Sequence, residues 1–406
     1  MTIEQIAGEG LCMQCGTCAG TCTREAVAMR WSLAFGWRPE IDAQRCDDCG
    51  ACLAVCPGRG LDYSAGAWWR AAGGDAPATD FLGPWRSLWF GWAADDDVRY
   101  QAASGGVASA ILLGALAQDL IDGAIVARPS RDNALAIEPQ LARSAPQILA
   151  CQGSKYNMVA MNAALREVLE CPGRYALVGL PCHIQGLRLA QRRDPRLRDR
   201  IVFALGIFCG WSAQPRATAL LARRQGIAAA DLAEVRYRGP SWPGGLRLTT
   251  KDGRICRRPY PDYYDNDRAV RALTPPRCRL CPDGLAELAD VSVGDAWIQR
   301  FLGSCGVSDL IVRTPVGEAL IESLAGEHLT LLAANESEML LSQKATYRLK
   351  RRVCRGRLWL RALTRRPLPR YPGLAMAADP RDALAGLIDA ADETMQRSFV
   401  ALRYHL

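Results

Sequence analysis

Two short cysteine-rich runs near the amino terminus constrain this chain more than any other feature of its sequence. Both share the spacing C-x2-C-x2-C-x3-C, with cysteines at Cys12, Cys15, Cys18 and Cys22 and again at Cys46, Cys49, Cys52 and Cys56. Two intervening residues let neighbouring sulfur atoms converge on one centre. The fourth cysteine of each run begins a helix that points the other way, so its sulfur reaches a second centre.

This duplicated spacing is typical of bacterial two-cluster ferredoxins and predicts two [4Fe-4S] clusters. The ligands of the first are Cys12, Cys15, Cys18 and Cys56, and those of the second are Cys46, Cys49, Cys52 and Cys22. Gly16 and Gly50 stand where the backbone must pass close to inorganic sulfide, which a Cβ atom would obstruct. Zinc usually takes its cysteines as two pairs, and disulfides require an oxidising compartment, so both alternatives fit the pattern less well.

Length and composition set the outer bounds. With 406 residues the chain is long enough for two or three domains, and it contains no apolar run of membrane-spanning length. The cluster motif begins at Cys12, which leaves no room for a signal peptide, so we expect a cytoplasmic protein whose 17 cysteines mainly bind cofactors. The net charge of +8 is carried almost wholly by arginine, a bias that we attribute to genome composition. We expect no nucleic-acid partner and no membrane span, with peripheral association left open.

Beyond the clusters, short apolar strands alternate with helices. A small polar stretch with Gly and Pro at 71–80 marks the expected domain boundary, and 28–41 has the pattern of a short hairpin. Expected strands cover 87–93, 121–127, 174–178 and 201–208, and expected helices cover 107–118, 157–170, 182–193 and 215–225. A β-rich insert with a hairpin tip at Lys251-Asp252-Gly253 follows, and 309–332 has a strand–helix–strand pattern. The alternation favours an α/β sheet with helices packed on it.

Four further cysteines stand where a third metal centre would form. Cys182 and Cys209 each follow a predicted strand, and Cys278 and Cys281 form a short pair. The carboxyl ends of strands form the ligand crevice in an open α/β sheet, so these thiols can face one site and hold a third [4Fe-4S] cluster. The alternative, a zinc site or turn at the pair with two buried core cysteines, stays open on spacing alone. The remaining cysteines are interpreted as structural: Cys151, Cys171, Cys256, Cys305 and Cys354.

A glycine pair opens the apolar helix expected at 107–118. The sequence there is Ser104-Gly105-Gly106, and glycines at a helix entrance let backbone N–H groups face an anion. The helix dipole favours a phosphate at the same place. A plain serine N-cap on a buried helix would explain the same residues, so both interpretations are kept.

Several short motifs occur in an order that resembles one known family. They are Ser104-Gly-Gly-Val, Gly153-Ser-Lys-Tyr156, Gly179-Leu-Pro-Cys-His-Ile-Gln, Gly206-Ile-Phe-Cys209, Arg238-Gly-Pro-Ser-Trp-Pro-Gly244, Cys278-Arg-Leu-Cys281 and Asp290-Val-Ser-Val-Gly-Asp-Ala-Trp297. Over residues 12–341 the chain thereby resembles the β-subunit family of the hydrogenases and dehydrogenases that use the deazaflavin coenzyme F420. That family also includes hydroxymethyl-chlorophyll reductase and a ferredoxin-dependent chlorophyllide vinyl reductase.

The resemblance implies an FAD flavoprotein with a [4Fe-4S] cluster beside the flavin and, here, a fused two-cluster ferredoxin module. It makes Cys182, Cys209, Cys278 and Cys281 the ligands of the third cluster. It places FAD phosphates near Ser104, Gly105 and Gly106, and Lys155 and Tyr156 in the flavin pocket. An ordinary surface position remains the alternative for Lys155, although lysine is rare in this chain.

Two residues are candidates for the catalytic side of that pocket. Trp242 is a candidate for lining the flavin or substrate face, with an aromatic turn as the alternative. His183 stands beside Cys182, where many members of the family carry Gln. It is a candidate to donate to sulfide, to raise the cluster potential or to relay a proton. A hydrogen-bonded structural histidine is the commoner case and stays as its alternative.

The carboxyl-terminal stretch lies largely outside the resemblance. Residues 339–378 contain no Asp or Glu, yet nine arginines and lysines crowd into 348–366. Apolar residues at roughly helical spacing accompany them, and 379–403 has the pattern of a final amphipathic helix. Such a basic helix suits an acidic electron carrier, anionic lipid or nucleic acid, but a solvated basic face is the preferred interpretation.

The expected architecture is therefore α+β/α/β. A bacterial-type 2[4Fe-4S] ferredoxin domain at 1–70 precedes an α/β domain at 81–338 that binds FAD and a cluster, and an Arg-rich helical segment covers 339–406. The predicted function is an iron–sulfur flavoprotein oxidoreductase with hydride transfer to or from the deazaflavin coenzyme. The alternatives are a ferredoxin-dependent reductase of a chlorophyllide-type tetrapyrrole and a non-catalytic electron-wiring subunit. Expected partners are a planar small-molecule substrate and an external ferredoxin or partner redox subunit.

Overall fold

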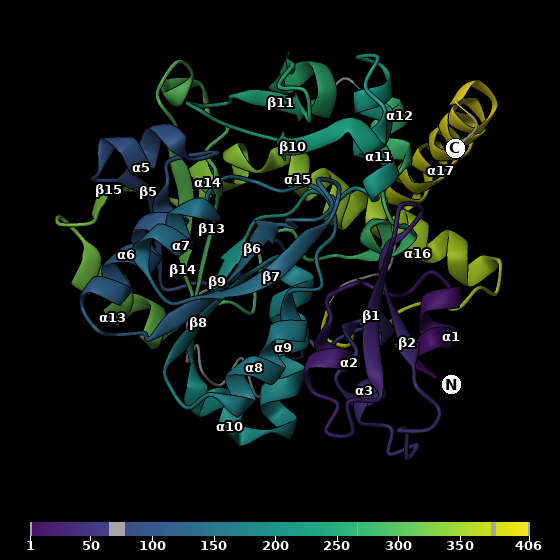
Figure 1. The fold of residues 1–406 in the computed structure, drawn as a ribbon, viewed down its shortest axis with the longest axis horizontal. Helices are drawn as coiled ribbons and strands as arrows, with labels where there is room; N and C mark the ends of the chain where they lie inside the picture. Colours follow the sequence, from purple (N-terminus) through teal and green to yellow (C-terminus); the bar gives the residue numbers. More distant parts are fainter. Residues whose placement is uncertain (1, 65–77, 266, 375–378, 405–406) are drawn as a thin grey trace.

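The computed structural model describes residues 2–64, 78–265, 267–374 and 379–404. The expected domain boundary at 71–80 lies mostly outside these residues. Among the described residues, no helix is both long enough and apolar enough to span a membrane. Figure 1 shows the arrangement of the elements, coloured from purple at the amino terminus to yellow at the carboxyl terminus.

The amino-terminal unit repeats one small pattern on either side of a hairpin. Its helices are α1 (Ile3–Gly8), α2 (Thr17–Gly20), α3 (Ala51–Ala54) and the 3-10 turn η1 (Pro57–Arg59), and its strands are β1 (Val27–Ser32) and β2 (Gly36–Ile41). The antiparallel β1–β2 pair confirms the hairpin predicted between the cysteine runs. Gly16 and Gly50 precede α2 and α3 with φ of +81° and +68°, a left-handed conformation that favours glycine. A Cβ atom on Gly16 would also lie 2.7 Å from the carbonyl oxygen of Ala160.

An eight-stranded mixed sheet forms the centre of the remaining chain, in the order β15-β5-β14-β13-β9-β8-β6-β7. Its strands are β5 (Ser87–Ala93), β6 (Gly123–Pro129), β7 (Ile137–Ala142), β8 (Tyr175–Gly179), β9 (Ile201–Ile207), β13 (Val291–Asp295), β14 (Ser308–Val312) and β15 (Leu329–Ala333). The neighbours β13, β9, β8 and β6 run parallel, as the alternation of strands and helices predicts. The outer pairings are antiparallel, which makes the sheet mixed.

Helices cover both faces of this sheet because its central strands are apolar on both sides. Ile125 and Leu177 share one buried core with α8 (Leu165–Glu170) and α9 (Pro181–Arg193). Ala124 and Ala176, their neighbours in sequence, share a second core with α6 (Val107–Ala117) and α13 (Pro315–Leu324). The helix expected at 157–170 is shorter than predicted, because the chain becomes helical only at residue 161.

The amino-terminal unit packs into the core on the α9 face. Ile6, Leu11 and Val55 belong to the same buried cluster as Ile184 and Leu187 of α9. In Figure 1 the unit accordingly lies beside α8 and α9. It is therefore packed against the sheet rather than tethered beside it.

A second, three-stranded sheet lies between β9 and β13 in sequence. It contains β10 (Leu232–Arg236), β11 (Gly245–Thr250) and β12 (Ile255–Pro259), all antiparallel. The turn between β11 and β12 confirms the hairpin predicted around Lys251. The helices α11 (Pro215–Arg223) and α12 (Arg268–Ala272) share its apolar core.

The carboxyl-terminal helices bury basic residues that were expected to be solvated. They are α14 (Glu336–Ser342), α15 (Lys344–Tyr347), the π-helical segment η7 (Arg348–Val353), α16 (Cys354–Leu363) and α17 (Pro380–Tyr404). Lys350 and Arg351 are only 3% and 1% exposed. Arg357 forms ion pairs with Asp389 and Glu393 of α17 at 2.5 and 2.6 Å. The interpretation of this stretch as a solvated basic face is therefore wrong for these three residues.

Candidate functional site

The amino-terminal cysteines lie in two groups that cross between the runs. In the first group, Cys12 has Cys56 and Cys15 as its charge neighbours. In the second group, Cys52 has Cys22 and Cys49 as its charge neighbours. The last cysteine of each run thus lies with the other run, which is the arrangement that the ferredoxin spacing implies.

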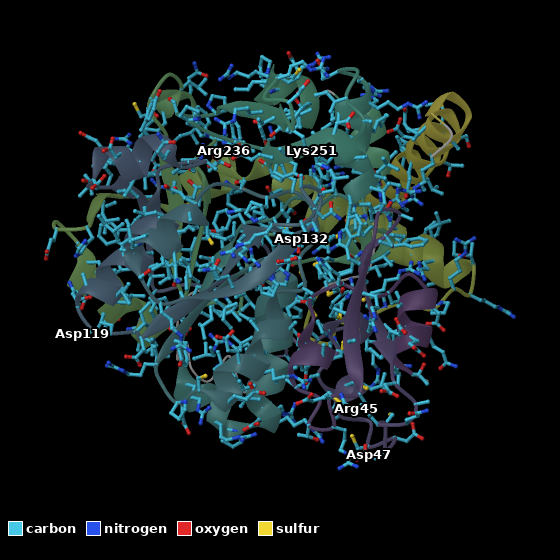
Figure 2. The ribbon with its side chains drawn as sticks, viewed as in Figure 1. Arg45, Asp47, Asp119, Asp132, Arg236 and Lys251 are labelled. Atoms are coloured by element: carbon cyan, nitrogen blue, oxygen red, sulfur yellow. The ribbon has the colours of Figure 1, made fainter. Side chains whose placement is uncertain are left out.

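The two groups differ in depth. Burial raises the pKa of the Cys12 thiol to about 12 and the pKa of Cys56 to about 11. Cys49, in contrast, is exposed. Arg45, directly before this second run, and Asp47, within it, lie at the outer end of the amino-terminal unit in Figure 2. The second group is therefore the one that faces solvent.

The other four predicted ligands converge from three parts of the chain. Cys182 lies in the first turn of α9, Cys209 follows β9, and Cys278 and Cys281 lie in or directly after the 3-10 turn η5 (Pro276–Leu280). Burial raises the pKa of Cys182, and the neighbouring thiols of Cys15, Cys209, Cys278 and Cys281 raise it further. The four thiols of the third group therefore lie close together, and Cys15 of the first group lies beside them.

Two buried contacts fix the third group against the first. Met13 packs against Cys182 and Cys281 in a small apolar cluster. Arg277 is fully buried and donates to the two backbone carbonyls directly after Cys56, at 3.1 and 3.2 Å. The Arg277 hydrogen bonds join segments that are more than 200 residues apart in sequence.

The four thiols of the third group match the ligand count of a cubane. Among the described residues, no three Cys, His, Asp or Glu side chains lie close enough to share one metal ion. A tetrahedral zinc site needs its sulfur ligands within about 2.3 Å of one centre. In a [4Fe-4S] cluster each thiolate binds a different iron, so the sulfur atoms stand farther apart. Four thiols supply one thiolate for each iron of a [4Fe-4S] cluster.

A cavity of about 690 Å³ opens at the carboxyl ends of the parallel strands. Its wall includes Val178 of β8, Ile207 of β9 and Val293 of β13, and this edge is where open α/β sheets usually bind ligands. The volume lies within the roughly 300–1,000 Å³ of typical small-molecule pockets. Cys209 also lines it, so the cavity and the third cysteine group share a wall.

Five of the seven residues predicted for the cofactor and catalytic positions line this cavity: Ser104, Gly106, Lys155, Tyr156 and His183. Gly105 and Trp242 are not on its wall. A Cβ atom on Gly105 would lie 2.6 Å from the carbonyl oxygen of Gly91, so this glycine serves close packing. The Trp242 ring packs against Trp297, which does line the cavity, with centroids 4.9 Å apart.

No serine side chain caps the entrance of α6. Gly106 occupies the N-cap position with φ of +78°, and no side chain caps the helix. The Ser104 hydroxyl instead donates to the carbonyl of Val307 at 3.0 Å. The first N–H groups of an 11-residue helix are thus left without a side-chain acceptor at the cavity wall. The plain serine N-cap is therefore wrong.

Lys155 is not an ordinary surface lysine. Its ammonium group donates to the carbonyl oxygens of Cys151 and Gln152, and burial lowers its pKa to about 8. The hydroxyl of Tyr156 accepts a hydrogen bond from Arg238 at 3.2 Å. Both side chains are held on the cavity wall by contacts with the protein itself.

His183 is held as a structural histidine. Its Nδ1 accepts a hydrogen bond from the backbone N–H of Leu180 at 3.0 Å, so Nε2 carries the proton and donates to Val159 at 3.1 Å. Burial lowers its pKa to about 4, which keeps the ring neutral. Since neither nitrogen is free to exchange a proton with a ligand, the structure argues against a catalytic role.

Comparison with known proteins decides the family. Residues 88–166 match the N-terminal part, and residues 173–337 the C-terminal part, of the family described as coenzyme F420 hydrogenase/dehydrogenase, beta subunit. The chain belongs to this family. Residues 11–61 match a 4Fe-4S dicluster domain, which supports the two amino-terminal clusters. The carboxyl-terminal segment after residue 337 lies outside these matches.

Relatives in the beta-subunit family are distant in sequence. Coenzyme F420 hydrogenase subunit beta from Methanosarcina barkeri is 25% identical over 59% of this chain and 79% of its own length. The F(420)H(2) dehydrogenase relative from Methanosarcina mazei is 24% identical over 80% of this chain and 85% of its own length. A chain of the F420-reducing [NiFe] hydrogenase complex from Methanosarcina barkeri shares the fold, with a TM-score of 0.56 and 21% identity over 70% of this chain and 96% of that chain.

In this member of the beta-subunit family, an ion pair that the sequence did not single out supports the cavity wall. Arg238, which is 2% exposed, pairs with Asp295 at 3.0 Å. The indole nitrogen of Trp242 donates to the same carboxylate at 2.8 Å. Trp242 therefore orients Asp295, which lines the cavity. The available signals were an arginine before Gly-Pro and an aspartate at a strand end, but nothing local shows that they pair.

Asp309 of β14 is a second residue that sequence reasoning missed. Burial raises its pKa to about 8. One carboxyl oxygen accepts hydrogen bonds from Ser342 and Gln343, both at 2.7 Å, and both of these residues line the cavity. The other oxygen has no hydrogen-bond partner among the described residues. The apolar strand around Asp309 gave no signal of this environment.

Proposed function

We propose that this chain is an iron–sulfur oxidoreductase that carries FAD and exchanges hydride with the deazaflavin coenzyme F420. Relatives named coenzyme F420 hydrogenase, F(420)H(2) dehydrogenase and coenzyme F420-dependent sulfite reductase support that substrate. The proposal includes three [4Fe-4S] clusters, one for each cysteine group described above.

One observation carries the proposal: the three cysteine groups and the cavity form a continuous series. The second group faces solvent at Cys49. The first group lies next to the third through Cys15 and Cys182. Cys209 belongs both to the third group and to the cavity wall. Such a series is suited to moving single electrons between the protein surface and the cavity, whereas unrelated structural cysteines have no reason to be ordered in this way.

The cavity offers residues for a dinucleotide and for a planar ring. FAD, when bound, supplies the change between one-electron and hydride chemistry. The uncapped N–H groups at the start of α6 would bind its phosphates, and Lys155 adds a cation on the same wall. Tyr260 and Trp297 also line the cavity and stack with centroids 5.8 Å apart and an interplanar angle of 21°. They provide an aromatic surface for a planar substrate.

The proposal places an external redox partner at the solvent-facing group. The solved relative is one chain of a hydrogenase complex, and by analogy this chain would exchange electrons with a ferredoxin or a partner redox subunit. Cys49 is exposed, whereas every cysteine of the first and third groups is buried or half-buried. A partner would therefore approach beside Arg45 and Asp47, at the outer end of the amino-terminal unit (Figure 2).

Anaerobic purification of the full chain tests the proposal. We expect about twelve irons, as three clusters of four, together with one bound FAD per chain. Dithionite should then drive reduction of F420, and reduced F420 should pass electrons to an acceptor dye. The full chain is required because Ile6, Leu11 and Val55 are part of the core of the sheet domain.

Cys281→Ala tests the series itself. We expect about eight irons, retained amino-terminal clusters and loss of ferredoxin-driven F420 reduction. Cys354 is a buried cysteine of α16 that lies outside the three groups, so Cys354→Ala is the control. This variant should keep about twelve irons. About eight irons in the unaltered chain would contradict the third cluster. Chlorophyllide reduction without F420 turnover would favour the tetrapyrrole alternative, and dye reduction with neither substrate would favour the wiring subunit.

A further inference from the structure

Lys350 is a buried lysine in the carboxyl-terminal segment that no matched family region covers. It lies in η7 and is 3% exposed. Its stem packs directly on the loop after Cys281, because a Cβ atom on Gly284 would lie 3.0 Å from the Lys350 Cγ. Thr346 and Leu349 of the same stretch line the large cavity. Lys350 therefore sits beside the third cysteine group, at the side where that group meets the cavity.

No acid compensates this ammonium group. In the described part of the chain, Lys350 forms no ion pair and no hydrogen bond to a carboxylate. Its neighbour Arg351 differs, since it pairs with the buried Glu287 at 2.6 Å. The strongest charge neighbours of Lys350 are instead cysteines: Cys281, Cys209, Cys278 and Cys354.

An uncompensated charge at this depth is costly. Removing an ammonium ion from water costs several kcal/mol even after the protein relaxes, unless an anion stands nearby. Three of the four cysteines around Lys350, namely Cys281, Cys209 and Cys278, are the proposed ligands of the third cluster.

We propose that Lys350 is the counter-charge of the third cluster and raises its reduction potential. The inference rests on the proposed function, because it requires the third cluster to be present. In the redox step the third cluster gains one electron and the first cluster loses one, with no bond made or broken. A fixed cation stabilises the reduced cluster, which carries one more negative charge than the oxidised cluster. Lys350 thereby favours electron transfer from the first group to the group that lines the cavity.

The test compares two lysine-to-methionine substitutions in the full, cluster-loaded chain. Lys350→Met removes the buried charge and keeps an unbranched side chain. Lys344→Met is the matched control, because Lys344 begins α15 in the same stretch but is exposed. The readouts are iron content and a redox titration followed by electron paramagnetic resonance. The third cluster is identified as the signal that Cys281→Ala removes.

We expect Lys350→Met to keep about twelve irons and to disfavour reduction of the third cluster at least tenfold. For a one-electron couple that is a potential lower by about 59 mV. The other two clusters should keep their potentials, as should all three in Lys344→Met. If Lys350→Met holds all its iron and no potential moves, the inference is wrong.

Lys350→Arg decides the case if Lys350→Met loses the third cluster. Arginine keeps the positive charge but changes the shape of the side chain. Retained iron and an unchanged potential in Lys350→Arg would support the counter-charge. Loss of the cluster there as well would show that Lys350 only fills space, and would overturn the inference. About eight irons in the unaltered chain would instead contradict the third cluster, so the two failures are distinguishable.

Discussion

A substitution at Arg351 tests how much the buried contacts of the carboxyl-terminal segment contribute to stability. Its guanidinium is 1% exposed and donates to Glu287 at 2.6 Å, to the carbonyl of Asp80 at 2.7 Å and to the carbonyl of Pro282. Pro282 directly follows Cys281, so the contact also supports the third cysteine group. Arg351→Met removes the charge and all three donated hydrogen bonds while keeping an unbranched side chain.

The expected loss of stability follows from the burial of both Arg351 and Glu287. The Glu287 side chain is only 2% exposed, so Arg351→Met leaves a buried carboxylate without its ion-pair partner. Removing one partner of a buried ion pair costs about 3–5 kcal/mol. In the double variant Arg351→Met/Glu287→Leu neither charge remains, and apolar replacement of both partners is often neutral or stabilising. We therefore expect the double variant to regain more than half of the lost stability.

Anaerobic thermal unfolding at one fixed scan rate measures both effects. At about 2–4 °C per kcal/mol, the single variant should melt about 6–20 °C lower than the unaltered chain. Arg348→Met is the control, since Arg348 is exposed three residues away, and it should shift melting by at most about 2 °C. Equal shifts in the two single variants, or a double variant no more stable than Arg351→Met, would refute the reasoning.

Two further predictions concern the cavity. Lys155→Ala should weaken FAD binding about tenfold or more, because a charge-assisted hydrogen bond contributes about 1.5–3 kcal/mol. Flavin content after gel filtration measures this loss. The control is Lys251→Ala, in the turn between β11 and β12, which should keep the flavin content of the unaltered chain. Asp309→Asn should make stability less dependent on pH. Because burial raises the pKa of Asp309 in the folded chain from 3.8 to about 8, the folded state retains a proton that the unfolded state releases, so stability falls as pH rises from about 4 to about 8. The melting temperature of the variant relative to the unaltered chain should therefore increase from pH 5 to pH 8, and a constant difference would contradict the assignment.

Features that depend on neighbouring residues could be predicted from the sequence. The spacing of the cysteine runs predicts two groups that each combine cysteines from both runs, because a spacing of three residues fixes the direction of each sulfur. The hairpin between them and the hairpin around Lys251 follow from local turn signals. The parallel centre of the sheet follows from apolar strands that alternate with helices. Each of these patterns lies within a few tens of residues.

Features that depend on distant partners could not be predicted. The Arg-rich stretch has the composition of a solvated helix, and only the fold brings Glu287 to Arg351, 64 residues away. His183 has a chemistry suited to proton transfer, but the backbone groups of Leu180 and Val159 occupy both its nitrogens. Trp242 is a sequence candidate for the flavin or substrate face, and it meets the cavity wall through Asp295 and Trp297 without lining the cavity itself. In each case the side chain has two plausible uses, and a tertiary contact selects one.

The contacts of the amino-terminal unit also restrict how electrons enter the chain under the proposed function. Undocking the unit would break two hydrogen bonds from the fully buried Arg277 to the loop after Cys56, which contribute about 1.5–3 kcal/mol each. It would also expose Ile6, Leu11 and Val55, at about 1.5–3 kcal/mol for each side chain. Even the lower values imply at least about 7 kcal/mol, or fewer than about one undocked molecule in 10⁵. The docked unit is therefore the populated form, and under the proposed function a partner exchanges electrons with it at its exposed second group, from which the first and third groups lead to the cavity.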